Sequence, residues 1–199
     1  NTSGSINGDI QVNVDWTGTC GVNALSNVYG AGNQAAYSGN TEVNILNGTV
    51  TGSVYGGGLG ATAVVTGTTK VNIDGSADGH SVMVTQNVLG GGDAAAVTGS
   101  TDVNIINGAI SGSVFGGGNA AGVSENGVVE VTGGTIASGV YGGSNASGTV
   151  GNTTVTIAAD GIIGTDAAHA NVHGGGYGKD TQVSGNVDVN IQGGTVNGD

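Results

Sequence analysis

One short string recurs along the chain and limits the folds open to it more than any other feature. It begins with valine, continues with a variable residue and ends in a glycine-rich triplet, as in VYGGG, and its copies start at Val28, Val54, Val88, Val114, Val140 and Val172. Successive copies lie 26, 34, 26, 26 and 32 residues apart, which indicates a 26-residue unit with two insertions, of eight and six residues. Such a period is typical of solenoids, in which stacked units share one core.

A second column of short β-rich strings precedes these anchors. The strings read VNV, VNI, VEV or VTI, and they start at Val12, Val43, Val71, Val103, Val129, Val155 and Val189. Because side chains alternate along a strand, the two aliphatic residues face one way and the central residue faces the other. A link such as NGTVTGS at Asn47 joins the two columns, and a third element such as ATAVVTG at Ala61 follows the glycines. Each unit is therefore expected to hold three short strands with Gly or Asn at its corners.

These columns predict the fold class. A unit of this size cannot bury its apolar face alone, but stacked copies can. The sequence predicts an all-β protein: one parallel β-solenoid over residues 1–199, with six to seven coils that each rise about 4.8 Å. A right-handed β-helix is favoured, because the strict six-residue period of a left-handed hexapeptide helix is absent. The 44 glycines argue against helices, since each costs about 1 kcal/mol relative to alanine in a helix interior.

Charge and composition exclude several kinds of partner. The formal net charge is -12, Lys70 and Lys179 are the only basic residues apart from histidine, and charged residues make up 8% of the chain. Nucleic-acid binding is excluded because clustered Lys and Arg hold the phosphate backbone. No apolar run reaches 18 residues, so direct membrane insertion is not expected. The single cysteine, Cys20, allows no internal disulfide.

The two ends of the sequence look alike. SINGD at Ser5 and TVNGD at Thr195 both resemble TVTGS at Thr49, so the chain is expected to start and stop at nearly the same point of the coil. Two interpretations stay open. The sequence is either a segment of a longer repeat array, or a subunit that stacks head to tail with other copies into an open filament.

The residue after each anchor valine is usually aromatic. Four of the seven aromatic residues occupy this position, and the variety of residues there suggests the outer face or a corner. The rings either stack along the rod or form a flat platform for sugar rings, which Leu89 and the histidine would interrupt. The candidate ligand-binding residues are Tyr29, Tyr55, Phe115, Tyr141 and His173.

A column of asparagines runs through the centre of the VNI strings. Its members are Asn13, Asn44, Asn72, Asn104 and Asn190. Stacked amides are expected to form a hydrogen-bonded ladder along the rod. The alternative is an outward array that orders water, as in ice-binding solenoids, but such arrays favour Thr-x-Thr rows, and Glu130 and Thr156 break this one.

The sequence contains few candidate residues for a metal site or for catalysis. The first insertion, DGSADGH, offers Asp74 and Asp78 as weak metal candidates, but it lacks the 12-residue spacing and terminal Glu of a calcium loop. In the second insertion, His169 and His173 are too far apart along a strand to share an ion. Asp102 and Glu130 are expected on neighbouring coils but on opposite faces, so they do not form a glycosidase pair. No cofactor and no enzymatic activity are expected.

The VYGGG and VNI columns resemble the glycine-rich β-helical repeats of large bacterial or archaeal cell-surface proteins, of the adhesin-like and autotransporter-passenger class. The resemblance implies an extracellular location and a non-enzymatic role as stalk, adhesive surface or filament subunit, with glycans or a host surface as partners. The alternative is a carbohydrate-binding or carbohydrate-degrading β-helix that uses the aromatic column. Ice binding is a minor alternative.

Overall fold

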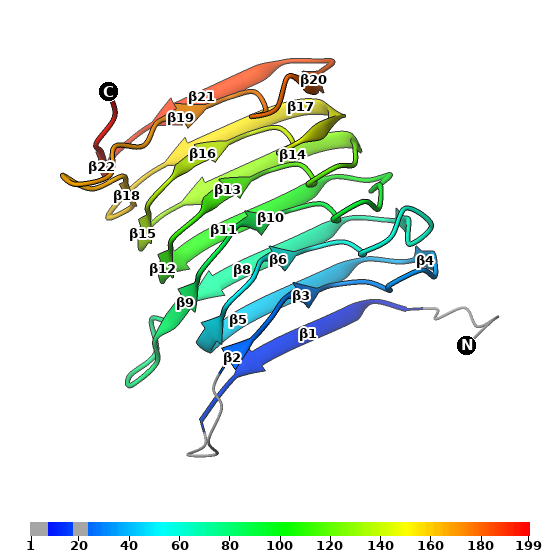
Figure 1. The fold of residues 1–199 in the computed structure, drawn as a ribbon, viewed down its shortest axis with the longest axis horizontal. Coiled ribbons are helices and arrows are strands. Elements are labelled where there is room, and N and C mark those ends of the chain that lie inside the picture. Colours follow the sequence, from blue (N-terminus) through cyan, green and yellow to red (C-terminus); the bar gives the residue numbers. More distant parts are fainter. Residues whose placement is uncertain (1–7, 18–23) are drawn as a thin grey trace.

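A computed structural model describes residues 8–17 and 24–199. In these residues the chain winds as a parallel β-solenoid of about six turns, with the first and the last described strands at opposite ends of the stack (Figure 1). The described residues contain no helix that could span a membrane. Cys20 and the start of SINGD at Ser5 lie outside the described residues.

The longest strands form one side of the rod, here called sheet A. Equivalent residues of the VNI strings pair in register across the coils, as Val43 with Val71 and Val103 with Val129, so the predicted column is confirmed. The strands of sheet A are β1 (Ile10–Asp15), β5 (Thr41–Val50), β8 (Thr69–Asp74), β11 (Thr101–Asn107), β14 (Val123–Val131), β17 (Ser147–Ile157) and β21 (Val187–Ile191).

The anchor strings form sheet C. Val28 pairs with Val54, and each later anchor pairs with the next, so the predicted spacings of 26, 34, 26, 26 and 32 residues are the spacings of stacked coils. The strands of sheet C are β3 (Val28–Tyr29), β6 (Val54–Tyr55), β10 (Val88–Leu89), β13 (Ser113–Phe115), β16 (Gly139–Tyr141) and β19 (Val172–His173).

The links between these sheets form strands of their own, so each complete coil carries four strand positions rather than the three expected. Sheet B contains β2 (Ala24–Leu25), the end of β5, β9 (Val82–Val84), β12 (Ala109–Ile110), β15 (Thr135–Ile136), β18 (Ile162–Ile163) and β22 (Thr195–Val196). The fourth position, sheet D, contains β4 (Tyr37–Ser38), β7 (Val65–Thr66), a bridge at Val97, the first residues of β14 and β17, and β20 (Asp180–Val183).

The core consists of the inward valines and isoleucines of sheets A, B and C. Val71, Val114 and Ile136 have no exposed surface, and their stacked counterparts in the inner coils are equally buried. A smaller cluster on sheet D contains Tyr37 and Val65 with three further valines. Strand pairing is the same for either hand of the coil, so the right-handed sense stays a prediction.

The two ends of the chain do not share a phase, contrary to the expectation from SINGD and TVNGD. Ile10, which follows Gly8 and Asp9, pairs with Thr41 at the start of sheet A. Thr195 pairs with Ile162 in sheet B instead. Gly8 and Asp9, the described part of SINGD, therefore lie at a different corner of the coil from TVNGD.

Candidate functional site

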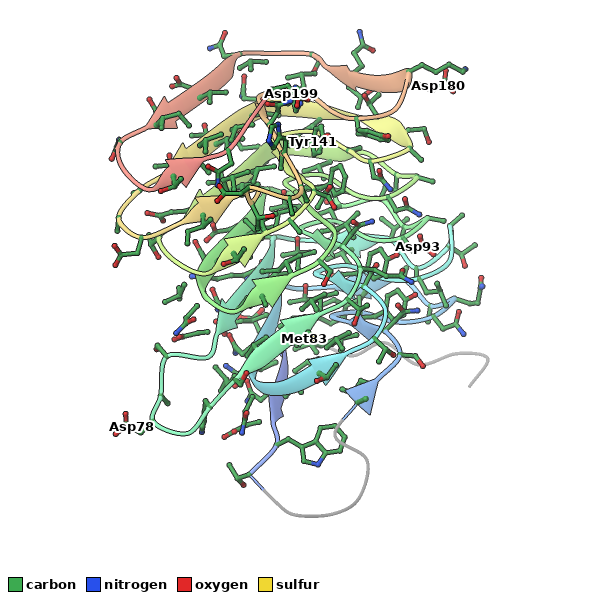
Figure 2. All side chains as sticks on the ribbon, turned by 60° about the vertical axis from the view of Figure 1, so that its left-hand side comes forward. Asp78, Met83, Asp93, Tyr141, Asp180 and Asp199 are labelled. Carbon is green, nitrogen blue, oxygen red and sulfur yellow. The ribbon has the colours of Figure 1, made fainter. Side chains whose placement is uncertain are left out.

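The aromatic column lies inside the rod. Tyr55, Leu89, Phe115 and Tyr141 are each at most 8% exposed, and they form a cluster separate from the main core. Figure 2 places Tyr141 among the coils rather than on the rim. Of the two expected positions, the outer face or a corner, the outer face was wrong in respect of exposure, because the coils above and below cover the inner rings.

The rings stack at the spacing of the coils. The ring centroids of Tyr29 and Tyr55 are 4.8 Å apart, those of Phe115 and Tyr141 are 5.0 Å apart, and those of Tyr141 and His173 are 4.8 Å apart, all nearly parallel. Leu89 separates the two stacks, whereas His173 extends one of them instead of interrupting it. The stacking interpretation is confirmed. The inner rings have no free face for a sugar.

Burial also changes the chemistry of these phenols. Loss of solvent raises the pKa of Tyr55 to about 12, with a smaller contribution from the negative charge of Asp93. Burial raises the pKa of Tyr141 in the same way. His173 is exposed at the end of the column, and the ring of Tyr177 lies nearly perpendicular to that of Tyr141, with the two centroids 5.5 Å apart. The column thus acts as packing along most of its length.

The asparagine column lies on the outward side of sheet A, where it forms the predicted ladder. Asn44 donates from Nδ2 to Oδ1 of Asn13 over 2.9 Å, Asn72 donates to Asn44 over 2.7 Å, and Asn104 donates to Asn72 over 3.0 Å. Asn190 lies beyond the break, opposite Thr156. Each ladder bond uses one N–H and one oxygen lone pair, which leaves Asn44 and Asn104 a second N–H; the second N–H of Asn72 donates to Glu42.

A charged row flanks this ladder. Gln11 donates from Nε2 to Oε2 of Glu42 over 3.0 Å, and Oε1 of the same carboxylate accepts from Asn72 over 3.1 Å. In the next two coils, Lys70 Nζ lies 3.7 Å from Asp102 Oδ2, with both side chains almost half exposed. The ladder and the charged row therefore form one connected polar surface across four coils.

Two open hollows lie on this surface and meet at Lys70. The first, of about 400 Å³, is lined by Asp9, Ile10, Gln11, Asn40, Thr41, Glu42, Thr68 and Lys70. The second, of about 330 Å³, is lined by Lys70, Asn72, Asp102, Asn104, Ile106, Glu130 and Thr132. Together they form what we call the sheet A groove, which runs across the strands along the rod axis.

The groove corrects one expectation from the sequence. Glu130 pairs with Asn104, which is two residues from Asp102, so Asp102 and Glu130 share the outward face. Both carboxylates line the second hollow. The prediction that they lie on opposite faces was wrong.

A buried threonine row escaped the sequence analysis. Thr41 and Thr69 each donate from Oγ1 to a glycine carbonyl, of Gly56 and Gly90 respectively, over 2.6 Å. Thr101 and Thr153 make the equivalent bonds in later coils. The signal was present as a threonine two residues before the VNI-type string in these four copies. The row ties sheet A to the glycine turn that follows sheet C.

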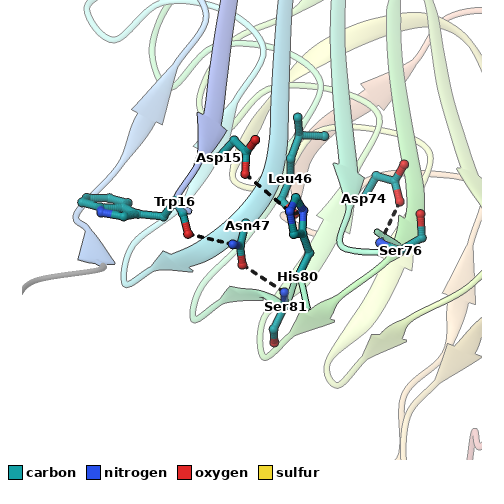
Figure 3. Close-up of polar contacts among 8 residues, drawn as sticks. All are labelled: Asp15, Trp16, Leu46, Asn47, Asp74, Ser76, His80 and Ser81. Carbon is teal, nitrogen blue, oxygen red and sulfur yellow. Dashed lines mark hydrogen bonds and ion pairs between the residues drawn. The ribbon is translucent and has the colours of Figure 1, made fainter. Parts of the chain in front are cut away.

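The first insertion forms a loop that His80 joins to the neighbouring strands. His80 places Nδ1 3.1 Å from the carbonyl oxygen of Leu46 and Nε2 3.8 Å from Oδ1 of Asp15 (Figure 3). Asp74 accepts from the backbone of Ser76, and Asp78 lies at the loop tip, away from the rod (Figure 2). The described part of the chain contains no cluster of three or more metal-ligating side chains.

The side chain of Asn47 also holds this loop, by hydrogen bonds to backbone groups. Asn47 donates from Nδ2 to the carbonyl of Trp16 over 2.7 Å and accepts from the backbone N–H of Ser81 over 3.0 Å (Figure 3). In the second insertion, His169 Nδ1 lies 3.0 Å from Asp199 Oδ1. Both insertions are therefore held by contacts between coils.

Comparison of the chain with protein-family models, curated proteins and solved structures finds no match.

Proposed function

We propose that this chain is an extracellular, non-enzymatic β-solenoid that acts as a surface stalk with an adhesive face. One observation carries the proposal: side chains of equivalent position contact each other from coil to coil, as rings in sheet C and as amides on sheet A. Such contacts stiffen a rod along its axis, because every coil is held to the next by side chains as well as backbone. A stiff rod is suited to holding a binding surface away from a cell.

End-to-end assembly belongs to the same proposal. In the last coil, Val189 and Ile191 are 41% and 53% exposed, whereas their pairing partners in β17, Val155 and Ile157, have no exposed surface. The strand β21 pairs only with β17 within the described residues. A further coil of the same repeat, from a continuing chain or a second copy, would cover this apolar edge.

Labelling of intact cells tests the stalk. Antibodies against the chain are expected to label unpermeabilised cells that make the protein, and deletion of its gene is expected to reduce their attachment to polysaccharide-coated surfaces under flow. Labelling only after permeabilisation would contradict the extracellular location. Unchanged attachment of the deletion strain would contradict the adhesive role.

A further inference from the structure

We infer that the sheet A groove binds a linear, uncharged polysaccharide that lies along the rod axis, with one sugar ring per coil. The inference rests on the adhesive role proposed above and names its ligand. It places the site on the outward face of sheet A, not on the aromatic column, whose inner rings are buried.

Spacing is the first argument. The coils are 4.8 Å apart, as the stacked rings of Tyr29 and Tyr55 show. A 1,4-linked pyranose advances its chain by a length close to this. Two amides of the ladder, Asn72 and Asn104, line the second hollow in successive coils, so successive sugar rings would meet equivalent groups there.

Hydrogen-bonding capacity is the second argument. Asn44 and Asn104 each keep one N–H beyond the ladder bond to the preceding coil, whereas the second N–H of Asn72 already donates to Glu42; the ladder oxygens keep a second lone pair. The carboxylates of Asp102 and Glu130 line the same groove and only accept. Sugar hydroxyls both donate and accept, so they match a surface in which amide donors lie beside carboxylate acceptors.

The groove also offers an apolar contact in its second hollow. Ile106 is 41% exposed and lines that hollow. The C–H face of a pyranose can pack on such a side chain while its hydroxyls reach the polar floor. A small number of placed polar groups beside apolar surface is the usual composition of a ligand site.

Charge decides between neutral and acidic glycans. The groove carries Glu42, Asp102 and Glu130 against a single cation, Lys70, which already faces Asp102 at 3.7 Å. The whole chain carries a formal charge of -12. A polyanion would be repelled by both the groove and the rod, so the ligand is an uncharged chain.

Nuclear magnetic resonance of the full ¹⁵N-labelled chain tests the site directly. The probes are cellohexaose, mannohexaose, xylohexaose and chitohexaose, with the corresponding disaccharides and an anionic hexagalacturonate. We expect at least one neutral hexaose to shift the side-chain amide signals of Asn44, Asn72 and Asn104. Its affinity should exceed that of its disaccharide by tenfold or more, and the anionic hexamer should cause no shift.

Two variants with matched chemistry locate the site. Ile106→Asp places a charge in the groove, and Met83→Asp places the same charge on the outward side of sheet B, where Met83 is 47% exposed. The first should weaken hexaose binding by tenfold or more, and the second should leave it unchanged. Equal loss in both variants overturns the assignment, as does the absence of amide shifts with all four neutral hexaoses. The absence of amide shifts is observed on the wild-type protein, so the inference can be refuted even if a variant fails to fold.

The inference and the stalk proposal can fail separately. If no hexaose binds while intact cells are labelled and the deletion strain attaches poorly, the groove assignment is wrong and the adhesive stalk stands. If a hexaose binds while the protein is found only inside cells, the stalk is wrong and the groove stands.

Discussion

The middle glycine of each sheet C triplet gives the sharpest test of the stacked fold. A Cβ added at Gly143 would lie 2.7 Å from the backbone nitrogen of Gly176 in the next coil. At Gly175, the equivalent position one coil later, a Cβ would meet nothing within 4 Å. An alanine side chain is therefore obstructed at Gly143 and free at Gly175, although the two glycines occupy the same position of the repeat.

The expected magnitude follows from two opposing effects. Replacing glycine with alanine at a compatible position stabilises a protein by about 0.4–1 kcal/mol, because the unfolded chain loses freedom. This effect is common to Gly143→Ala and Gly175→Ala and cancels between them. Overpacking costs about 1–3 kcal/mol and applies only to Gly143→Ala. We expect the free energy of unfolding of Gly143→Ala to be lower than that of Gly175→Ala by about this overpacking cost.

Urea unfolding of the full chain, followed by circular dichroism, measures the difference. Solenoids can unfold in stages, so thermal midpoints of both variants should be recorded alongside the urea midpoints. Gly175→Ala should match or exceed the wild type, and Gly143→Ala should fall below it. Equal destabilisation by the two substitutions would refute the assignment of glycine to coil clearance.

Three further predictions concern side chains that join the coils. Asn72→Ala should lower the free energy of unfolding by about 1–2 kcal/mol, because it removes bonds to Asn44 and Glu42; an unchanged urea midpoint would contradict the ladder. Thr69→Val should cost about 1–3 kcal/mol in the same assay, because the Gly90 carbonyl loses its buried hydroxyl donor. Tyr55, with its pKa raised from 10.0 to about 12, should show delayed phenolate absorbance in an alkaline titration. Because the folded pKa is the higher one, its contribution to stability is present below pH 10.0 and is lost as the pH rises toward 12, so wild type should lose stability more steeply than Tyr55→Phe over that range.

The parallel stacking could be predicted from the sequence because the repeat also determines which residues pair between coils. When coils stack in parallel, equivalent residues of successive units pair, so the spacing from Val54 to Val88 in the sequence is also their pairing in sheet C. The alternation within VNI likewise predicts that Val103 is buried and that Asn104 lies on the outward side. Both inferences depend on one repeated unit and on strand geometry alone.

The features that could not be predicted from the sequence, such as the burial of the aromatic rings, depend on contacts between coils. Alternation within a two-residue strand predicts that Tyr55 leaves the main core, but not that its neighbours in the stack cover it. The position of the chain ends within the coil was predicted wrongly because an Asn-Gly pair occurs at more than one corner. Asn47 and Gly48 follow a VNI string, whereas Asn126 and Gly127 precede the VEV string at Val129. A short glycine-rich string therefore does not identify its place in the coil.

Stacking also determines which groups remain for a partner. A ring between two coils gives both faces to its neighbours, so the inner part of the aromatic column cannot bind a second ring. An amide in a ladder gives up only part of its hydrogen-bonding capacity and keeps the rest toward solvent. The binding chemistry of this rod is therefore expected on sheet A. Since the asparagines give way to Glu130 and Thr156, the affinity for a neutral glycan should rise with its length only until the chain spans the coils from Asn13 to Glu130.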